Sequence, residues 1–128
     1  MNERAFVDTN VLVYAHDRGA GERHRLAREL VLGLWRDRTG VISTQVLQET
    51  YVNLRRKAAK PLPVDEVRSV VQDYLAWEVV VIDPMAVIQA MRYEERYGIA
   101  FWDALIVQAA NTAGVATLLT EDLSHGQA

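Results

Sequence analysis

The 128-residue chain contains no cysteine, only three prolines and seven glycines, and no long apolar run. The lack of cysteine excludes a disulfide framework, a thiolate metal site and a cysteine nucleophile. No segment approaches the roughly 18 consecutive apolar residues of a membrane-spanning helix, and the opening residues MNER do not resemble a secretory signal. We therefore expect a cytoplasmic protein that does not interact with membranes.

The composition is that of a globular domain. Apolar residues make up 50% of the chain and charged residues 24%, which excludes intrinsic disorder. The length suits one domain built around one hydrophobic core. The formal net charge of −3 argues against general coating of polyanions, although it permits a local basic patch.

Short apolar runs alternate with segments of helical periodicity along the chain. The runs, which we expect to be strands, cover residues 5–7, 40–42, 79–82 and 117–119. Helical patterns lie between them, and we expect the first helix to be capped by Asn10. Strands that alternate with helices indicate a parallel sheet with helices on both faces. The predicted fold class is therefore α/β, in a single domain.

Acidic residues follow three of the predicted strands; Asp83 follows the third, and the two candidates for a site follow the first and the fourth. Asp8 comes directly after the first strand and Asp122 shortly after the fourth. Each alone is best explained as a turn, cap or loop residue. In a parallel sheet, however, both lie at the carboxyl edge, where ligands of such folds bind.

Asp103 lies in the first turn of a predicted helix. Ile106, Val107 and Ala110 flank it on one helix face, so we expect its carboxylate within an apolar stripe. Buried carboxylates are rare unless they are paired or bind a metal. Helix capping would explain its place in the first turn but not the apolar face. The position therefore favours a functional role.

Glu49 shares one face of the helix predicted at 44–57 with Asn53 and Arg56, opposite the apolar side. The default interpretation is a solvated face, and the alternative is a face that lines a cleft. The basic residues that end this helix have two interpretations as well. They either complement the negative end of the helix dipole or contact phosphates.

The four acidic candidates are Asp8, Glu49, Asp103 and Asp122. If they converge, their charges repel one another unless a cation lies among them. A site with only oxygen ligands suits Mg²⁺ or Mn²⁺. Such an ion can activate water and stabilise charge during phosphodiester hydrolysis.

Four segments carry these acids: FVDTN at 6–10, STQVLQE at 43–49, FWDALI at 101–106 and LTED at 119–122. In this order and at these separations they resemble the PIN-domain ribonucleases, and most closely the VapC-type toxins of bacterial toxin–antitoxin pairs. The resemblance implies a three-layer α/β/α fold with a short, mostly parallel sheet. It also implies an endoribonuclease that depends on Mg²⁺ or Mn²⁺, in which the four acids hold the metal and carry catalysis.

The resemblance implies further residues and partners. Thr9 and Thr120 would orient a ligand or water beside the acids. The substrate would be RNA, the inhibitor a cognate VapB-type antitoxin, and the assembly a homodimer. Residues 1–128 would form a single PIN domain without the short final strand of the family. Contacts to RNA or antitoxin would come from Asn53, Arg55, Arg56 and Lys57.

Two other functions remain open. A phosphoacceptor receiver or an aspartate-dependent phosphatase uses similar acids, but it needs a lysine late in the chain, and the two lysines are Lys57 and Lys60. A catalytically inactive PIN-like binding module is the second, and the presence of all four acids argues against it. No motif brings two histidines together for metal-free cleavage. We expect the following aromatic residues in the core or a dimer interface rather than as base-stacking surfaces: Trp35, Tyr51, Tyr74, Trp77 and Trp102.

Overall fold

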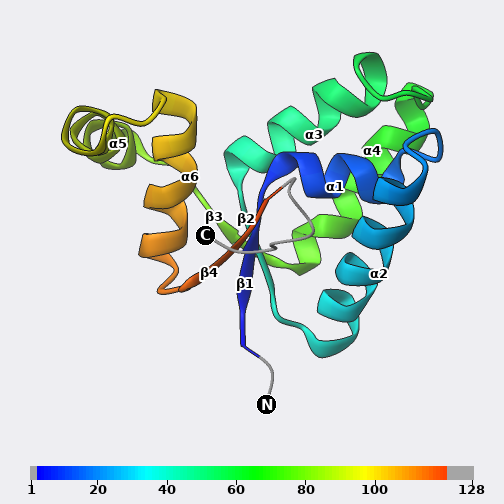
Figure 1. The fold of residues 1–128 in the computed structure, drawn as a ribbon, viewed down its shortest axis with the longest axis horizontal. Coiled ribbons are helices and arrows are strands. Elements are labelled where there is room, and N and C mark those ends of the chain that lie inside the picture. The colour runs from blue at the N-terminus through cyan, green and yellow to red at the C-terminus, as the bar shows by residue number, and fades with distance from the viewer. Residues whose placement is uncertain (1–2, 121–128) are drawn as a thin grey trace.

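The computed structural model describes residues 3–120, in which helices cover both faces of a four-stranded sheet (Figure 1). Asp122 and the place of the family's final strand lie outside the described residues. None of the helices within residues 3–120 is long and apolar enough to span a membrane. The elements are β1 (Ala5–Val7), α1 (Thr9–His16), α2 (Glu22–Asp37), β2 (Gly40–Ser43), α3 (Thr44–Arg56), α4 (Val64–Asp73), the 3₁₀ turn η1 (Tyr74–Ala76), β3 (Glu78–Val80), α5 (Pro84–Tyr97), α6 (Phe101–Thr112) and β4 (Thr117–Leu119).

The sheet has the strand order β3-β2-β1-β4, and every neighbouring pair is parallel. The chain adds β2 and β3 on one side of β1, and then crosses to add β4 on the other side. Helices α1 to α4 accordingly lie on one side of the sheet and α5 and α6 on the other (Figure 1). The predicted α/β/α architecture is confirmed. In such folds the crevice for ligands opens where the direction of winding reverses, here between β1 and β4.

Several predicted boundaries differ from the structure by one or two residues, and two of the differences have a clear local cause. Helix α1 begins at Thr9, because Asp8 rather than Asn10 caps it and accepts a hydrogen bond from the backbone N–H of Thr9. Strand β3 ends at Val80 instead of residue 82. The backbone N–H of Ile82 donates to the hydroxyl of Thr44 (3.1 Å) rather than to the neighbouring strand, so the chain has already left the sheet.

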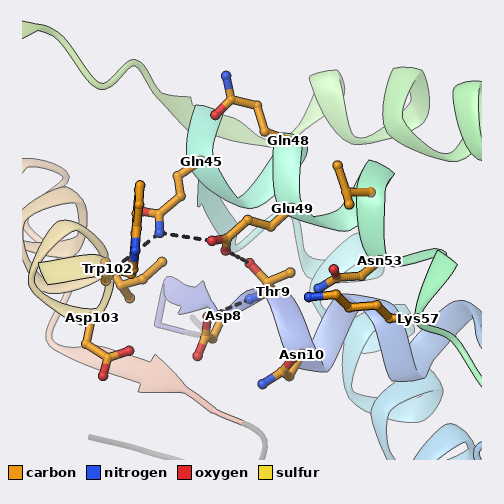
Figure 2. Close-up of a pocket in the computed structure, with 12 residues that line it drawn as sticks. Asp8, Thr9, Asn10, Gln45, Gln48, Glu49, Asn53, Lys57, Trp102 and Asp103 are labelled. Carbon is orange, nitrogen blue, oxygen red and sulfur yellow. Dashed lines mark hydrogen bonds between the residues drawn. The ribbon is translucent and has the colours of Figure 1, made fainter. Parts of the chain in front are cut away.

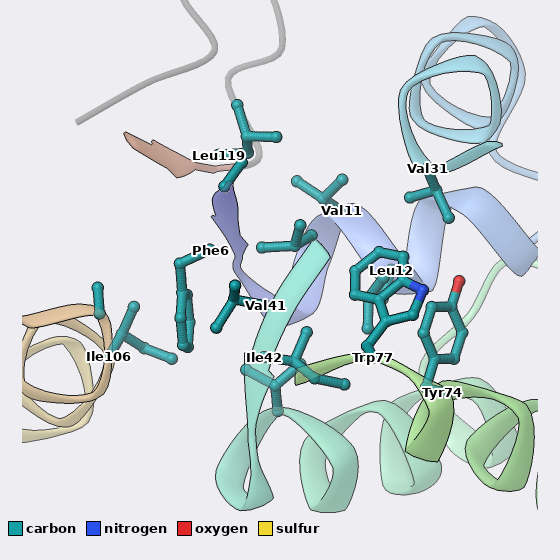
Figure 3. Packing of buried hydrophobic residues seen from close by; sticks show 14 of the residues in the cluster. Phe6, Val11, Leu12, Val31, Val41, Ile42, Tyr74, Trp77, Ile106 and Leu119 are labelled. Atoms are coloured by element: carbon teal, nitrogen blue, oxygen red, sulfur yellow. The ribbon is translucent and has the colours of Figure 1, made fainter. Parts of the chain in front are cut away.

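The core fills both spaces between the sheet and the helices (Figure 3). Phe6 of β1 is fully buried in the same cluster as Ile106 of α6. On the other face, Tyr74 and Trp77 pack edge to face with ring centroids 4.9 Å apart. Trp77 lies against β2 so closely that a Cβ on Gly40 would meet its ring at 2.4 Å, which only glycine avoids.

The prediction for the aromatic residues is confirmed for Tyr74 and Trp77, which are buried. Trp35 is partly buried and packs against this core. Trp102 does not belong to the core, because 62% of it is exposed. Trp102 lines the pocket described next.

Candidate active site

A pocket of about 460 Å³ opens at the carboxyl edge of the sheet (Figure 2). Its walls come from the start of α1, the exposed side of α3 and the first turns of α6. Three of the predicted acids line it, one from each of these segments. The lining residues are Asp8, Thr9, Asn10, Gln45, Gln48, Glu49, Val52, Asn53, Lys57, Trp102, Asp103 and Ile106.

Asp8 is placed by both its backbone and its side chain. Its N–H donates to the carbonyl oxygen of Leu119 in β4 (2.9 Å), which continues the ladder between β1 and β4. Its Oδ1 accepts from the N–H of Thr9 (2.7 Å) and caps α1. The positive end of the helix dipole favours the carboxylate there. Asp8 therefore both caps α1 and lines the pocket.

Glu49 lies on α3 and is held by two neighbours. The hydroxyl of Thr9 donates to Oε1 (2.7 Å), and the amide of Gln45 donates to Oε2 (3.4 Å). Glu49 and Asn53 both line the pocket, so this face of α3 borders a cleft rather than bulk water. Arg56, on the same face by helical spacing, is exposed and does not line the pocket.

Asp103 lines the pocket, but the expectation that it is buried is wrong, because its side chain is exposed. The apolar stripe of α6 continues as Ile106 and Ala110, which are buried in the cluster that contains Phe6. Strand β1 has only three residues, Ala5–Val7. The first turn of α6 therefore extends past the carboxyl edge of the sheet, and the face that is buried one turn later opens into the pocket at Asp103.

The basic residues at the end of α3 differ in their positions. Lys57 lines the pocket, on the opposite side from Asp103 (Figure 2). Arg55 is turned away to Tyr51, donating to its hydroxyl (3.2 Å) with its guanidinium 5.6 Å from the ring centroid. Thr120 follows β4 and does not line the pocket.

The sequence analysis did not assign six of the lining residues to a site, namely Asn10, Gln45, Gln48, Val52, Trp102 and Ile106, and two of them have informative surroundings. Trp102 is exposed beside Asp103, and Gln45 is 5% exposed beneath it. The amide nitrogen of Gln45 donates both to Glu49 and to the carbonyl oxygen of Trp102 (3.3 Å), which ties α3 to α6. Its Oε1 is buried and has no hydrogen-bond partner among the described residues. The spacing of four residues between Gln45 and Glu49 was the available signal, because such pairs lie side by side on a helix.

The family model of the PIN domain matches residues 5–127. The chain belongs to the PIN-domain family. No curated protein matches the chain significantly.

The solved structures that resemble this PIN domain include the following two. One is VapC20 of Mycobacterium tuberculosis, described as a sarcin-ricin loop cleaving toxin, with a TM-score of 0.71 and 20% identity over 94% of this chain and 93% of that chain. The other is DNA-bound VapBC from Salmonella typhimurium, with a TM-score of 0.59 and 19% identity over 93% of this chain and 85% of that chain. At these identities the matches demonstrate a shared fold.

The donor set of this PIN domain fits a hard divalent cation. Asp8, Glu49 and Asp103 offer only carboxylate oxygens, the ligands that Mg²⁺ and Mn²⁺ prefer. Within residues 3–120, no three acidic or histidine side chains are close enough to enclose one ion. Mg²⁺ does not require such a cage, since it is usually held by one or two carboxylates and keeps several waters.

Proposed function

We propose that this PIN domain is an endoribonuclease of the VapC type that depends on Mg²⁺ or Mn²⁺. The observation that carries the proposal is the arrival of three carboxylates, from β1–α1, α3 and α6, in one pocket at the switch point of the sheet. The fold shared with a toxin described as cleaving the sarcin-ricin loop supports RNA as the substrate. The bond that is hydrolysed is a phosphodiester of the RNA, and water is the nucleophile.

The acids of the pocket would hold the ion. We assign this role to Asp8, Glu49 and Asp103, one or two in direct contact and the rest through the waters of the ion, together with Asp122, which lies outside the described residues. Once bound, the ion supplies an activated water and neutralises the charge that develops on the phosphate. Thr9 keeps Glu49 oriented through its 2.7 Å hydrogen bond, and we assign Thr120 a similar role beside Asp122.

Lys57 and Asn53 lie where the RNA backbone would leave the acids. A cation in this position attracts phosphate without reading the base sequence. Lys57 lines the pocket, whereas Arg55 is engaged with Tyr51 and Arg56 lies outside the lining. We therefore propose Lys57 as the main phosphate contact of this helix end, with Arg55 and Arg56 as outer contacts to RNA or antitoxin.

The proposed protein partners are a VapB-type antitoxin and a second copy of the chain. The fold shared with the Salmonella typhimurium VapBC complex supports the antitoxin. Exposed apolar residues on and before α5, namely Val81, Met85, Ile88 and Met91, support self-association, because apolar surface of this kind is commonly covered by a partner. Light scattering of the purified chain tests the dimer, and a monomeric mass would contradict it.

The decisive experiment measures cleavage of a mixed pool of RNA with Mg²⁺, with Mn²⁺ and with EDTA. Wild-type protein is compared with Asp8→Asn, which removes one pocket charge and keeps an acceptor for the cap of α1. Asp65→Asn is the matched control, because that acid is 90% exposed on α4, forms an ion pair with Arg68 and does not line the pocket. We expect cleavage that needs both the metal and Asp8 and is unchanged in Asp65→Asn.

Two outcomes would contradict the proposal. Cleavage that persists in EDTA at the same sites would exclude the metal, and full activity of Asp8→Asn would exclude this pocket. A protein that binds RNA or antitoxin but cleaves no RNA with either ion would instead be the inactive binding module.

A further inference from the structure

Trp102 is the largest side chain of the pocket and is exposed to it. Its exposed fraction is 62%, although tryptophan carries so much apolar area that it is usually at least partly buried. It lines the pocket directly before Asp103 in the chain. Such an indole is open to a ligand that occupies the pocket beside the acids.

The indole is held in place from two sides. Its ring packs in a T-shaped arrangement against Phe101, with the centroids 5.2 Å apart, and Phe101 packs against the cluster between α5 and α6. Its backbone carbonyl accepts a hydrogen bond from Gln45, the same amide that donates to Glu49 (Figure 2). The aromatic surface is therefore preorganised, and its position is coupled to that of a proposed metal ligand.

We propose that the indole of Trp102 is a stacking platform for the nucleobase next to the scissile phosphate. The inference rests on the proposed ribonuclease function and names how the RNA is bound. A phosphate bound through the cation that Asp8 and Asp103 would hold would have an adjoining base beside Trp102, while Lys57 lies on the other side of the pocket, where the backbone would continue (Figure 2). Stacking of the base on Trp102 thus contributes affinity on one side of the pocket, and the contact of the RNA backbone with Lys57 contributes affinity on the other.

The chemistry of the pocket favours a nucleobase as the occupant. Single-stranded RNA is recognised by stacking of unpaired bases on aromatic side chains, combined with hydrogen bonds to base edges. Beside the indole, the amides of Gln48 and Asn53 line the same pocket and offer both donors and acceptors. An apolar peptide side chain would use the indole but would leave these amides without partners.

The test is a cycle that combines a protein change with a substrate change. Cleavage of a short single-stranded RNA that wild-type protein cuts is measured for wild-type and Trp102→Ala. Each is also tested on the same RNA with an abasic nucleotide on one or the other side of the cleaved bond. We expect Trp102→Ala to raise KM roughly ten- to a hundred-fold with little change in kcat. We expect an abasic nucleotide on one side to have the same effect.

Stacking is identified by coupling between the protein change and the abasic substitution in the RNA. If base and indole contact each other, Trp102→Ala costs little on the abasic RNA, because the interaction is already lost. Trp102→Phe retains most of the affinity, whereas Trp102→Leu, which is apolar but not aromatic, does not. Leu75→Ala is the control for truncation of an exposed apolar residue, since Leu75 is 61% exposed in η1 and outside the pocket. Thermal melting confirms that all variants are folded.

Three results would overturn the inference. An unchanged KM for Trp102→Ala on the intact RNA, or independent effects of the two changes, would remove the stacking contact and leave the ribonuclease function intact. Unchanged RNA kinetics together with weakened inhibition by antitoxin would assign Trp102 to the protein partner. Wild-type protein that cleaves no RNA would remove the proposed function and this inference with it.

Discussion

Single hydrogen bonds determine how the acids of the pocket are oriented. The 2.7 Å bond from the hydroxyl of Thr9 to Glu49 is the shortest that Glu49 receives, and Thr9 itself is 4% exposed. A neighbour that orients a metal ligand typically changes metal affinity or activity ten- to a hundred-fold when it is removed. Under the proposed function, in which Glu49 holds the ion, the hydroxyl of Thr9 is such a neighbour.

Thr9→Val removes this hydroxyl and keeps the shape of the side chain. We expect the concentration of Mn²⁺ needed for half-maximal cleavage to rise about ten-fold or more. Thr9→Ser, which restores the donor, should recover most of the wild-type affinity. Equal metal dependence of Thr9→Val and wild-type protein would show that the bond does not support the ion.

Asp103 provides the second prediction at this scale. Because its side chain is exposed at the first turn of α6, Asp103→Asn should leave the melting temperature nearly unchanged. Loss of a metal-binding charge should lower kcat/KM by roughly a thousand-fold, from the several kcal/mol that a bound ion supplies. Thermal melting checks the first statement and cleavage assays check the second, with Asp65→Asn as the control in both. Cleavage at a near wild-type rate would mean that Asp103 only interacts favourably with the N-terminal end of α6 and does not take part in catalysis.

At the scale of elements, the end of α1 is fastened to the segment that follows α3. Asp17 is 3% exposed and accepts hydrogen bonds from the N–H groups of Gly19 (3.0 Å), Ala59 (2.7 Å) and Lys60 (2.9 Å). Helix α1 begins beside Asp8, and α3 carries Glu49. The Asp17 contacts therefore fix the two helices that present these acids to the pocket.

Asp17→Ala should lower the free energy of unfolding by about 3 kcal/mol, because it removes the buried charged acceptor of three N–H groups. Asp17→Asn should cost less, since the amide oxygen still accepts. Urea denaturation measures both values, and Asp65→Ala serves as the exposed control. If Asp17→Ala lowers the free energy of unfolding no more than the control does, water has replaced the carboxylate as the hydrogen-bond acceptor.

At the scale of the whole molecule, stability depends on a partly buried histidine between α1 and the α4–η1 segment. The Nε2 of His16 lies 2.8 Å from the hydroxyl of Tyr74, and the rings pack edge to face. Burial lowers the pKa of His16 below its ordinary value of 6.5; positive charge on His24 and Arg28 lowers it further, and Asp73 opposes the shift. Burial also raises the pKa of Tyr74, which keeps its hydroxyl protonated and able to donate to His16.

The sign of the pH dependence follows from this shift. The unfolded chain takes up the His16 proton near pH 6.5, whereas the folded chain takes it up only at lower pH. The stabilisation is thus complete above about pH 7 and is lost as the pH falls from 6.5 through the folded pKa. We expect urea midpoints to fall between pH 7.5 and 5.5 in wild-type protein and to fall less in His16→Gln. Parallel pH profiles for the two proteins would contradict the prediction.

Much of the architecture was predictable from local sequence. The strands at 5–7 and 117–119 were predicted with their observed bounds, because each is a short apolar run next to a polar residue. The placement of Asp8 and Glu49 in a shared pocket followed from the carboxyl-edge rule and from the motif segments. The residues whose exposure or position was misjudged share one property, namely that residues of another helix or strand form their surroundings.

The sequence by itself determined the order of strands and helices, the parallel sheet and the identity of the acids that follow the strands or line a helix face. Only the tertiary structure decided that the first turn of α6 passes the edge of the sheet, which exposes Asp103 and Trp102 to the pocket. It also decided that Lys57 rather than Arg56 lines the pocket. The physical reason is that periodicity defines the direction of a side chain around its own helix. Burial depends instead on where the neighbouring elements end, and that is set by contacts between residues far apart in the chain.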